Sequence, residues 1–266
     1  MRLGRIAHTK GICFAIIDEA DDGSLLAKEI SGTPFTPPET TGREWPLSDV
    51  RLLSPSLPTK VVALGRNYAD HVAEVFRESS DSLPPTYFLK PSSSVVGPNA
   101  PIKIPDFAKK VEFEGELAVV IKKVSKNIRE ENWQDHVLGY TVCNDVSSRE
   151  LQHSDGQWAR GKGIDTFCPL GPWIETDMER IDLGDQKINA YLTHDGQRVQ
   201  KQDSNTDQML KKVGEIVAEI SQSMTLLPGD VITTGSPSGT AELTPGDTIE
   251  IEIPGVGSLS NPVERA

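Results

Sequence analysis

Short runs of apolar residues, separated by turn residues, recur along the whole chain. Gly11–Ile17 and Val61–Leu64 have the length and the β-branched composition that strands favour. Val111–Ile121 begins with acidic residues at every second position and ends in an unbroken apolar stretch, which predicts a strand whose second half is buried on both faces. Leu138–Cys143 is a further predicted strand.

Two segments are predicted helices. Asn67 is expected to cap a helix through Tyr68–Phe76, and Thr206–Met224 carries apolar residues three and four positions apart. Most of the remainder has the pattern of strand and turn, so the predicted fold class is α+β and β-rich. We predict a small β domain in residues 1–55 and a larger domain in residues 56–266.

Two turn-then-strand units near the carboxyl end resemble each other. Leu227–Ile232 and Thr244–Ile249 both contain Pro-Gly-Asp, and we interpret them as successive parts of a β-roll because the period does not recur elsewhere. The polar, turn-rich segment 77–86 is expected to be a mobile lid.

The chain of 266 residues is acidic, with a formal net charge of −12. Its Lys and Arg residues form no basic stripe, which argues against binding to nucleic acid or to an anionic membrane. No stretch approaches the roughly 20 apolar residues of a membrane span, and the amino terminus lacks the apolar run of a signal peptide. We therefore expect a cytoplasmic protein.

Soft metal ligands are scattered along the chain. Cys13, Cys143 and Cys168 form no C-x-x-C pair, so neither a disulfide framework nor a thiolate zinc site is indicated, and each is expected to be a buried small hydrophobe. The five histidines form no H-E-x-x-H or H-x-H cluster. The pattern favours carboxylate ligands, and magnesium or manganese over zinc.

Glu112, Glu114 and Glu116 alternate along one predicted strand, so their side chains point to one face roughly 6 to 7 Å apart. At an effective dielectric constant of about 20, two such anions repel by about 2 to 3 kcal/mol. Water, shared protons or a cation can relieve this repulsion, and Gly115 leaves room for a hard divalent cation. Asn144–Asp145, after the next predicted strand, is the best candidate for a further ligand. The alternative is that these acids are solvated at strand ends.

Other groups could move protons or carry positive charge. His71 and Glu74 lie on one face of the predicted helix, where they form either a general base or an ordinary surface pair. Lys162 lies between glycines and Lys90 follows two apolar residues. Near a metal, such a lysine could neutralise a developing enolate; the alternative is a surface turn.

Three more features concern anion binding. Arg149, followed by Gln152, could grip a substrate carboxylate or pair with Glu150 or another acid. Thr233–Gly239 is typical of a backbone anion nest with a hydroxyl from Thr234, or of a tight turn. No Walker loop, G-x-G-x-x-G or G-x-S-x-G motif is present, so nucleotide binding and a serine nucleophile lack support.

Six ordered motifs resemble those of the fumarylacetoacetate hydrolase family and span about residues 58–264. They are Gly65–Glu74, Phe88–Pro91, Phe113–Ile121, Asn144–Arg149, Lys162–Phe167 and Pro228–Gly235. The leading domain resembles that of bacterial members, especially actinobacterial ones described as oxaloacetate decarboxylases or as hydroxyhepta-dienedioate isomerases. The resemblance implies a mixed β-roll and a homodimer.

The resemblance also implies a role for each candidate residue. The residues that match the family's ligands for Mg²⁺ or Mn²⁺ are Glu114, Glu116 and Asp145. Those that match its catalytic groups are His71 and Glu74, a dyad, and Lys162, near the metal-bound oxo group. Those that match substrate-orienting or pocket-lining positions are Arg66, Lys90, Arg149, Gln152 and Thr234. Departures from the commoner family residues, which leave the metal ligands intact, occur at Ser236–Thr240 and Lys122.

The expected substrate is a small 2-oxo acid that reacts through a pyruvate enolate stabilised by the metal and Lys162. Oxaloacetate decarboxylation is the first expectation, because the resemblance extends over the leading domain. The alternatives are hydrolysis of an acylpyruvate or fumarylacetoacetate-type β-diketo acid, in which His71 and Glu74 activate water, and isomerisation of 2-hydroxyhepta-2,4-diene-1,7-dioate. Outside enzymes, the alternative is a protein that binds a metal or carboxylate without turnover.

Overall fold

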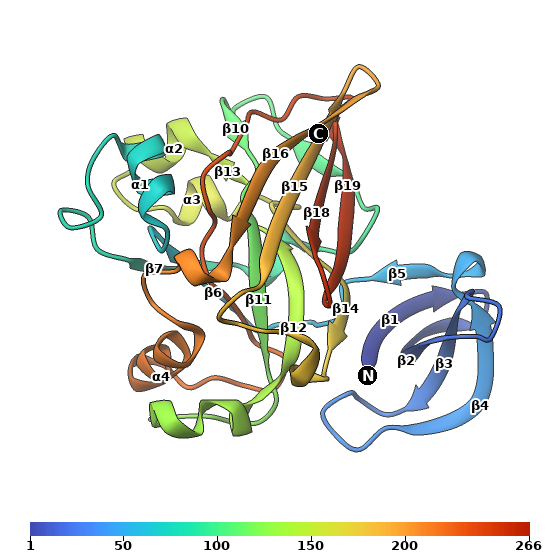
Figure 1. The fold of residues 1–266 in the computed structure, drawn as a ribbon. Helices are drawn as coiled ribbons and strands as arrows, with labels where there is room; N and C mark the ends of the chain where they lie inside the picture. The colour runs from blue at the N-terminus through green and yellow to red at the C-terminus, as the bar shows by residue number, and fades with distance from the viewer.

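The protein is described by a computed structural model that covers residues 1–266 and consists mainly of strands. A sheet of twelve strands, a sheet of five and a two-stranded ladder form the β-structure, and short helices lie around them (Figure 1). The predicted α+β, β-rich class is confirmed.

The elements are as follows. The strands of the large sheet are β1 (Arg2–His8), β2 (Gly11–Glu19), β3 (Leu25–Ser31), β4 (Glu39–Pro46), β5 (Arg51–Leu53), β6 (Val61–Gly65), β7 (Thr86–Lys90), β8 (Val95–Val96), β11 (Gly115–Ile121), β12 (Val137–Asn144), β14 (Cys168–Glu175) and β17 (Val231–Thr233). The five-stranded sheet contains β9 (Ile102–Ile104), β15 (Lys187–His194), β16 (Gln197–Asn205), β18 (Thr248–Ile253) and β19 (Gly257–Arg265). The two-stranded ladder joins β10 (Val111–Glu112) and β13 (Ser147–Ser148). The α-helices are α1 (Ala69–Phe76), α2 (Arg149–Ser154), α3 (Ala159–Lys162) and α4 (Val213–Ser223), and the 3₁₀ helices are Leu47–Asp49, Ser92–Ser94, Glu130–His136, Met178–Arg180 and Thr206–Gln208.

The large sheet runs through both parts of the molecule. Its order is β4-β3-β2-β1-β14-β12-β11-β17-β6-β7, with β5 on β1 and β8 on β14. Strands β1–β5 form the smaller lobe at the right of Figure 1, and β1 joins the larger part through its antiparallel pairing with β14. Because hydrogen bonding continues between the lobes, the domain boundary at residue 55 stays a prediction.

Strand β11 lies near the middle of this sheet, between β12 and β17, which explains its unbroken apolar run. Leu117, Val119 and Ile121 belong to the main core of 34 buried residues. Ala118 and Val120 point to the other face and belong to a second core of 10 buried residues. Both faces of β11 are therefore buried, as predicted.

The predicted cap of the first helix is wrong. Helix α1 begins at Ala69, with Tyr68 at the N-cap position and no side-chain capping bond. The Asn67 amide instead donates to the carbonyls of Thr234 and Lys211, and its oxygen accepts the Lys211 N–H at 2.7 Å. Asn67 is fully buried. Its side chain forms hydrogen bonds with these backbone groups and does not cap the helix, because a buried polar group without a partner is costly.

The second predicted helix starts later than expected, because its first residues bind other segments. Thr206 exchanges hydrogen bonds with Gln186, and the Leu210 N–H bonds to the Asn67 carbonyl. These contacts leave only a 3₁₀ turn at Thr206–Gln208, and α4 starts at Val213.

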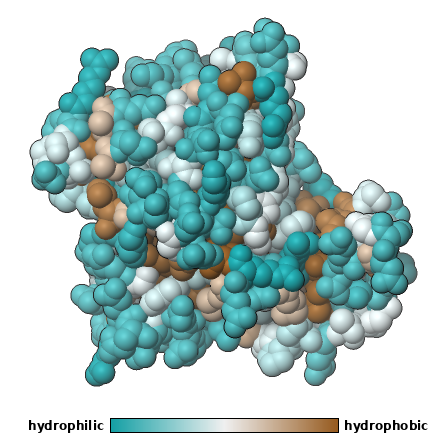
Figure 2. Space-filling model, viewed as in Figure 1, coloured by the Kyte–Doolittle hydropathy of each residue, from teal (hydrophilic) through white to brown (hydrophobic).

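The predicted lid, residues 77–86, consists of the largely exposed loop that connects α1 to β7 and of the first residue of β7 (Figure 1). That it is a lid remains a prediction. No helix has the length and apolar character that crossing a bilayer requires. In the view of Figure 2 the surface is mainly hydrophilic, with apolar areas that are small and separate, one of them where the two lobes meet.

Candidate functional site

Three buried carboxylates converge where β11 begins and β12 ends. Gly115 pairs with Asn144 in the β11–β12 register, and Glu114 and Glu116 flank this pair. The Asp145 N–H donates to the Glu114 carbonyl at 2.9 Å. Carboxylate oxygens of the three acids lie within 4.8 Å of one another. The structure thus brings together the three residues predicted as metal ligands, which we call the carboxylate centre.

Two lysines neutralise part of this negative charge. The Lys162 ammonium, at the end of α3, donates to Glu114 Oε2 at 2.6 Å and to Asp145 Oδ2 at 2.7 Å. The Lys90 ammonium, at the end of β7, donates to the other Asp145 oxygen and to the carbonyls of Val146 and Lys162. Both lysines are buried, which costs several kcal/mol for an unpaired ion. Acids and lysines therefore hold one another in place.

Arg149 supplies a third cation from the start of α2. Its Nε donates to Glu112 Oε2 at 2.7 Å, and its Nη1 lies 2.6 Å from Glu114 Oε1 and donates to Gln152 Oε1 at 2.9 Å. Its Nη2 is buried and has no partner. The guanidinium thus pairs with acids of the protein itself and retains one unpaired nitrogen.

Burial and the neighbouring charges shift the pKa values of Glu114 and Glu116 in opposite directions. Burial acts to raise the pKa of Glu114, but Lys162 and Arg149 outweigh it and hold that pKa well below its usual range. Burial raises the pKa of Glu116 well above its usual range, and the two neighbouring carboxylates raise it further. Its hydrogen bond comes from the Gly235 N–H at 2.7 Å. A divalent cation can displace the proton of such a carboxylate, so this donor set fits a hard ion.

His71 joins the carboxylate centre to Glu74. It is buried on the inner face of α1, with Nε2 3.5 Å from Glu114 Oε1 and Nδ1 3.6 Å from Glu74 Oε2. Burial acts to lower the pKa of His71, but the two carboxylates outweigh it and raise that pKa. The predicted dyad is therefore assembled beside the predicted ligands, although His71 Nδ1 is buried and makes no hydrogen bond at this separation from Glu74.

Backbone N–H groups of residues 234–239 hold acids of this site. Gly235 donates to Glu116 at 2.7 Å, and Gly239 donates to Glu74 at 3.0 Å. Their φ angles of +94° and +93° lie in the left-handed region that favours glycine. The Thr234 hydroxyl donates to the carbonyl of Leu117. The predicted nest therefore binds carboxylate side chains, and Thr234 ties it to β11.

Arg66 lies on an aromatic wall beside the centre and makes no hydrogen bond or ion pair with the carboxylates. Its guanidinium is 4.6 Å from the Phe76 ring and 5.0 Å from the Trp158 ring, and its Nε is buried without a partner. Lys162 Nζ lies 5.9 Å from the same Trp158 ring. Gly65 permits this packing, because a Cβ there would lie 2.3 Å from Trp158.

The sequence patterns did not single out Gln202, which secures the start of β11. It is fully buried, and its Oε1 accepts the Gly115 N–H at 3.0 Å. Its Nε2 donates to Ser236 Oγ at 2.9 Å and to the Pro237 carbonyl at 2.8 Å. Gln202 thus joins the ligand-bearing segment to the loop that holds Glu116. It lies in β16, whose polar residues form no motif, so no sequence signal distinguishes it.

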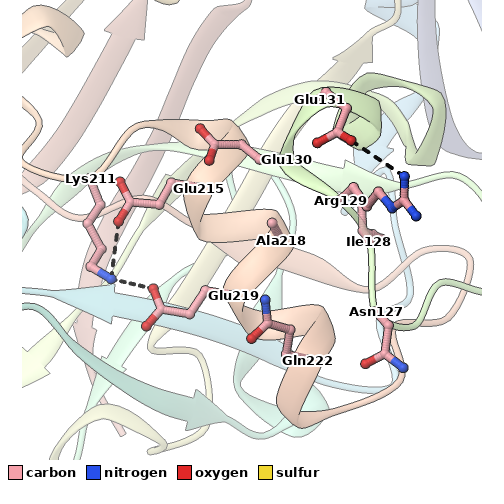
Figure 3. A pocket seen from close by; sticks show the side chains of 10 residues that line it. All are labelled: Asn127, Ile128, Arg129, Glu130, Glu131, Lys211, Glu215, Ala218, Glu219 and Gln222. Carbon is pink, nitrogen blue, oxygen red and sulfur yellow. Dashed lines mark hydrogen bonds and ion pairs between the residues drawn. The ribbon is translucent and has the colours of Figure 1, made fainter.

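A charged groove between α4 and residues 127–131 does not belong to this centre (Figure 3). Lys211 pairs there with Glu215 at 3.4 Å and with Glu219, and Arg129 lies 3.9 Å from Glu131. None of the predicted ligand, dyad or substrate-binding residues lines it.

Family models match nearly the whole chain. The C-terminal domain of fumarylacetoacetate (FAA) hydrolase matches residues 60–264, and an N-terminal domain described as Rv2993c-like matches residues 1–55. The chain is 49% identical to Protein Rv2993c of Mycobacterium tuberculosis, with 100% of this chain and 98% of the relative covered. It is 42% identical to the mitochondrial oxaloacetate tautomerase fahd2 of Xenopus laevis, with 81% and 69% covered.

Solved structures show the same fold over the whole chain. The crystal structure of Cg1458 with inhibitor is similar at a TM-score of 0.98 and 64% identity, with 100% of both chains covered. The 2-hydroxyhepta-2,4-diene-1,7-dioate isomerase from Mycobacterium marinum is similar at a TM-score of 0.88 and 48% identity, with 100% of this chain and 98% of that chain covered. Maleylpyruvate hydrolase from Sphingobium sp. SYK-6, in complex with manganese(II) and pyruvate, has a TM-score of 0.78 at 28% identity, with 100% of both chains covered.

Proposed function

The chain belongs to the fumarylacetoacetate hydrolase family, and on that premise we propose that it cleaves a carbon–carbon bond of a small 2-oxo acid with the help of a divalent cation. Oxaloacetate decarboxylation is the reaction we place first. The observation that carries the proposal is the carboxylate centre, in which Glu116 is a buried acid that contacts no cation of the protein.

Glu114, Glu116 and Asp145 would hold Mg²⁺ or Mn²⁺, since three buried carboxylates offer hard oxygen donors within 4.8 Å of one another. When bound, the ion supplies Lewis acidity toward a 2-oxo group. The manganese and pyruvate in the maleylpyruvate hydrolase structure support this choice.

Lys162 would stabilise the negative charge that develops during cleavage. Its ammonium is buried, is fixed by Glu114 and Asp145, and lies 5.1 Å from the Phe88 ring. A fixed positive charge in a site that excludes water lowers the energy of an enolate oxygen more than it would in solution. Loss of carbon dioxide from oxaloacetate produces that enolate directly, and one proton at carbon completes pyruvate.

His71 would supply or remove the proton, depending on the substrate. Its raised pKa favours a protonated imidazole, which can return a proton to the enolate directly or through one water. If the substrate is an acylpyruvate, the dyad must instead act in its deprotonated form, in which His71 and Glu74 take a proton from water as it attacks the distal carbonyl. The same residues thus support a hydrolase as the second candidate, and the hydrolase among the similar structures favours it.

An isomerase is the third candidate, and it would use the same groups without cleavage. The relatives with tautomerase and isomerase names support proton transfer at an enol. In that reaction His71 would move a proton between two positions of the substrate, and pyruvate would not form.

The test is pyruvate release from oxaloacetate and from acetylpyruvate in parallel, with Mg²⁺ or Mn²⁺ and with a chelator, after the rate with metal alone is subtracted. Metal-dependent turnover of oxaloacetate alone establishes a decarboxylase, and preference for acetylpyruvate establishes a hydrolase. If neither releases pyruvate, enol–keto conversion of oxaloacetate and isomerisation of a dioate are measured next. Absence of all these reactions leaves a metal- or carboxylate-binding protein and contradicts the proposal.

The expected assembly is a homodimer, as the family resemblance implies. Light scattering on the eluting protein measures this directly. A single species at the chain mass of 29.0 kDa would contradict it.

A further inference from the structure

Three metal-ligating side chains from adjacent strands meet in the smaller lobe, far along the sequence from the carboxylate centre. Ile6 pairs with Cys13 between β1 and β2, so His8 lies diagonally from Cys13 on the same face. Ala15 pairs with Glu29 between β2 and β3, so Cys13 also lies diagonally from Glu29. The sequence predicted Cys13 as a buried hydrophobe, but it is only partly buried and faces His8. We call His8, Cys13 and Glu29 the lobe cluster.

The separations within the lobe cluster suit a tetrahedral ion. One donor atom from each of the three residues lies within 4.8 Å of the others, and Cys13 Sγ is 3.6 Å from His8 Nε2. A tetrahedral zinc ion with Zn–S of about 2.3 Å and Zn–N of about 2.05 Å places sulfur and nitrogen about 3.6 Å apart. The two atoms thus already have the spacing of zinc ligands.

Glu29 provides the second, independent observation. It is only 6% exposed, and its Oε2 is buried without a hydrogen-bond partner. The other oxygen, Oε1, is held by the Arg43 guanidinium. A buried carboxylate oxygen without a partner is costly, and a metal ion bound by Cys13 and His8 would satisfy it. The Arg43 contact is the kind of outer partner that orients a ligating carboxylate.

We propose that the lobe cluster is a second metal site, specific for zinc-class ions, with Cys13 Sγ, His8 Nε2 and Glu29 Oε2 as ligands and the fourth position open to solvent. Thiolate and imidazole select zinc or cobalt over magnesium. Cys13 releases one proton on binding. The His8 proton moves from Nε2 to Nδ1, and the Lys10 N–H that now donates to Nδ1 at 3.1 Å turns to water from its exposed position.

The role of this ion would be structural. The core confined to the lobe has four buried residues, Ile6, Ala15, Ile17 and Ala27, while Leu3 and Ile30 join the second core. A core this small gives little stability unless a cross-link such as a metal ion adds to it. Ligands on β1, β2 and β3 would join three strands at one end of that core. Trp45, which stacks on the His8 ring at 4.1 Å, already limits the imidazole's orientation.

The test is a cobalt(II) titration of the whole protein in excess Mg²⁺, which is added to fill the proposed site at the carboxylate centre. We expect one equivalent of cobalt to produce a thiolate-to-cobalt charge-transfer band, which all-oxygen coordination cannot produce. Cys13→Ser should abolish the band, and Glu29→Gln should weaken binding. Cys168→Ser is the matched control, because Cys168 is buried beside Cys143 in another core; it should retain the band.

Zinc content provides a second measurement that does not depend on cobalt. After incubation with zinc in excess Mg²⁺ and gel filtration, the wild type should retain one zinc per chain, and Cys13→Ser and His8→Gln should each lose it. Circular dichroism shows whether the variants are folded. The absence of both band and retained zinc in the folded wild type, or a band that survives Cys13→Ser, would overturn the proposal.

Discussion

The carboxylate centre and the lobe cluster are built by the same device and differ in donor atoms and in surrounding charge. In both, neighbouring antiparallel strands bring the ligands together: diagonally on one face in the lobe cluster, and where β11 begins and β12 ends in the carboxylate centre. The carboxylate centre has only oxygen donors and three buried cations around it. The lobe cluster has sulfur, nitrogen and oxygen donors and a single cation, Arg43, whose side chain is 53% exposed. Strand geometry therefore brings the ligands together in both sites, whereas the type of donor atom determines which ion binds.

The charged groups around the two sites also differ in whether they can take part in a reaction. Around the carboxylate centre, buried cations fix the acids and leave one of them, Glu116, without a cationic partner. Lys162 and His71 add groups that can stabilise an anion and move a proton. In the lobe cluster the imidazole, His8, is itself a proposed ligand and the cation, Arg43, is half exposed, so we expect a structural ion there.

The largest expected effect is on turnover. His71→Ala should lower kcat for acylpyruvate hydrolysis by about 10²- to 10⁴-fold, because water loses its general base. The decrease for oxaloacetate should be smaller, since only reprotonation is affected. His194→Ala is the control, because His194 is exposed and bonded to Asp247. Equal rates for wild type and His71→Ala on both substrates would remove the dyad from the mechanism.

The next effect is on stability and compares one acid from each site. Asp145→Asn should lower the free energy of unfolding by about 3 to 5 kcal/mol, because Lys90 and Lys162 lose a buried charged partner. Glu29→Gln should cost about 1 kcal/mol or less, since its partner Arg43 is half exposed. Urea denaturation of the metal-free proteins measures both. Similar losses in the two variants would show that burial of the cations does not distinguish the sites.

Magnesium should stabilise the protein by binding at the carboxylate centre and not at the lobe cluster. At a concentration one hundred times its Kd, Mg²⁺ should stabilise the folded chain by about 2.7 kcal/mol. Glu116→Gln should lose this gain, whereas Cys13→Ser should keep it because a hard ion does not select a thiolate. Denaturant unfolding with and without Mg²⁺ measures the gain. A full gain in Glu116→Gln would place the ion elsewhere.

The smallest effect is a pH dependence of the metal-free protein. Because the pKa of Glu116 is raised on folding, the folded chain binds more protons than the unfolded chain between the ordinary glutamate pKa and the raised value. The free energy of unfolding should therefore fall as pH rises through that window. The lowered pKa of Glu114 contributes only below the ordinary value.

Urea unfolding in chelator over a series of pH values measures this slope. Below the ordinary pKa of histidine, Glu116→Gln should flatten it, and so should saturating Mg²⁺, which replaces the proton. Above that value, the raised pKa of His71 adds a slope of the same sign. Cys13→Ser should leave it unchanged. An identical slope in wild type and Glu116→Gln would contradict the assignment of the proton to Glu116.

Part of the fold follows from local patterns. The apolar run of β11 predicted burial on both faces. The alternating acids before it predicted repulsion between carboxylates, which water, shared protons or a cation must relieve. Asn67 shows where local patterns fail. Its position before a helix predicts an N-cap, but in the folded chain its side-chain amide forms hydrogen bonds with the backbone of Thr234 and Lys211. Local patterns do not reveal which distant backbone groups need a partner.

The residues of the two sites show the same division. The sequence alone determined the types and local spacings of the chemical groups: the acids at Glu114 and Glu116, the His71–Glu74 pair, and the scattered cysteines and histidines. Only the tertiary structure decided that Gln202 supports the first site and that His8, Cys13 and Glu29 meet at all. The physical reason is that spacing within one element sets the direction of side chains, whereas the distance between elements depends on strand register and on the packing of the whole chain.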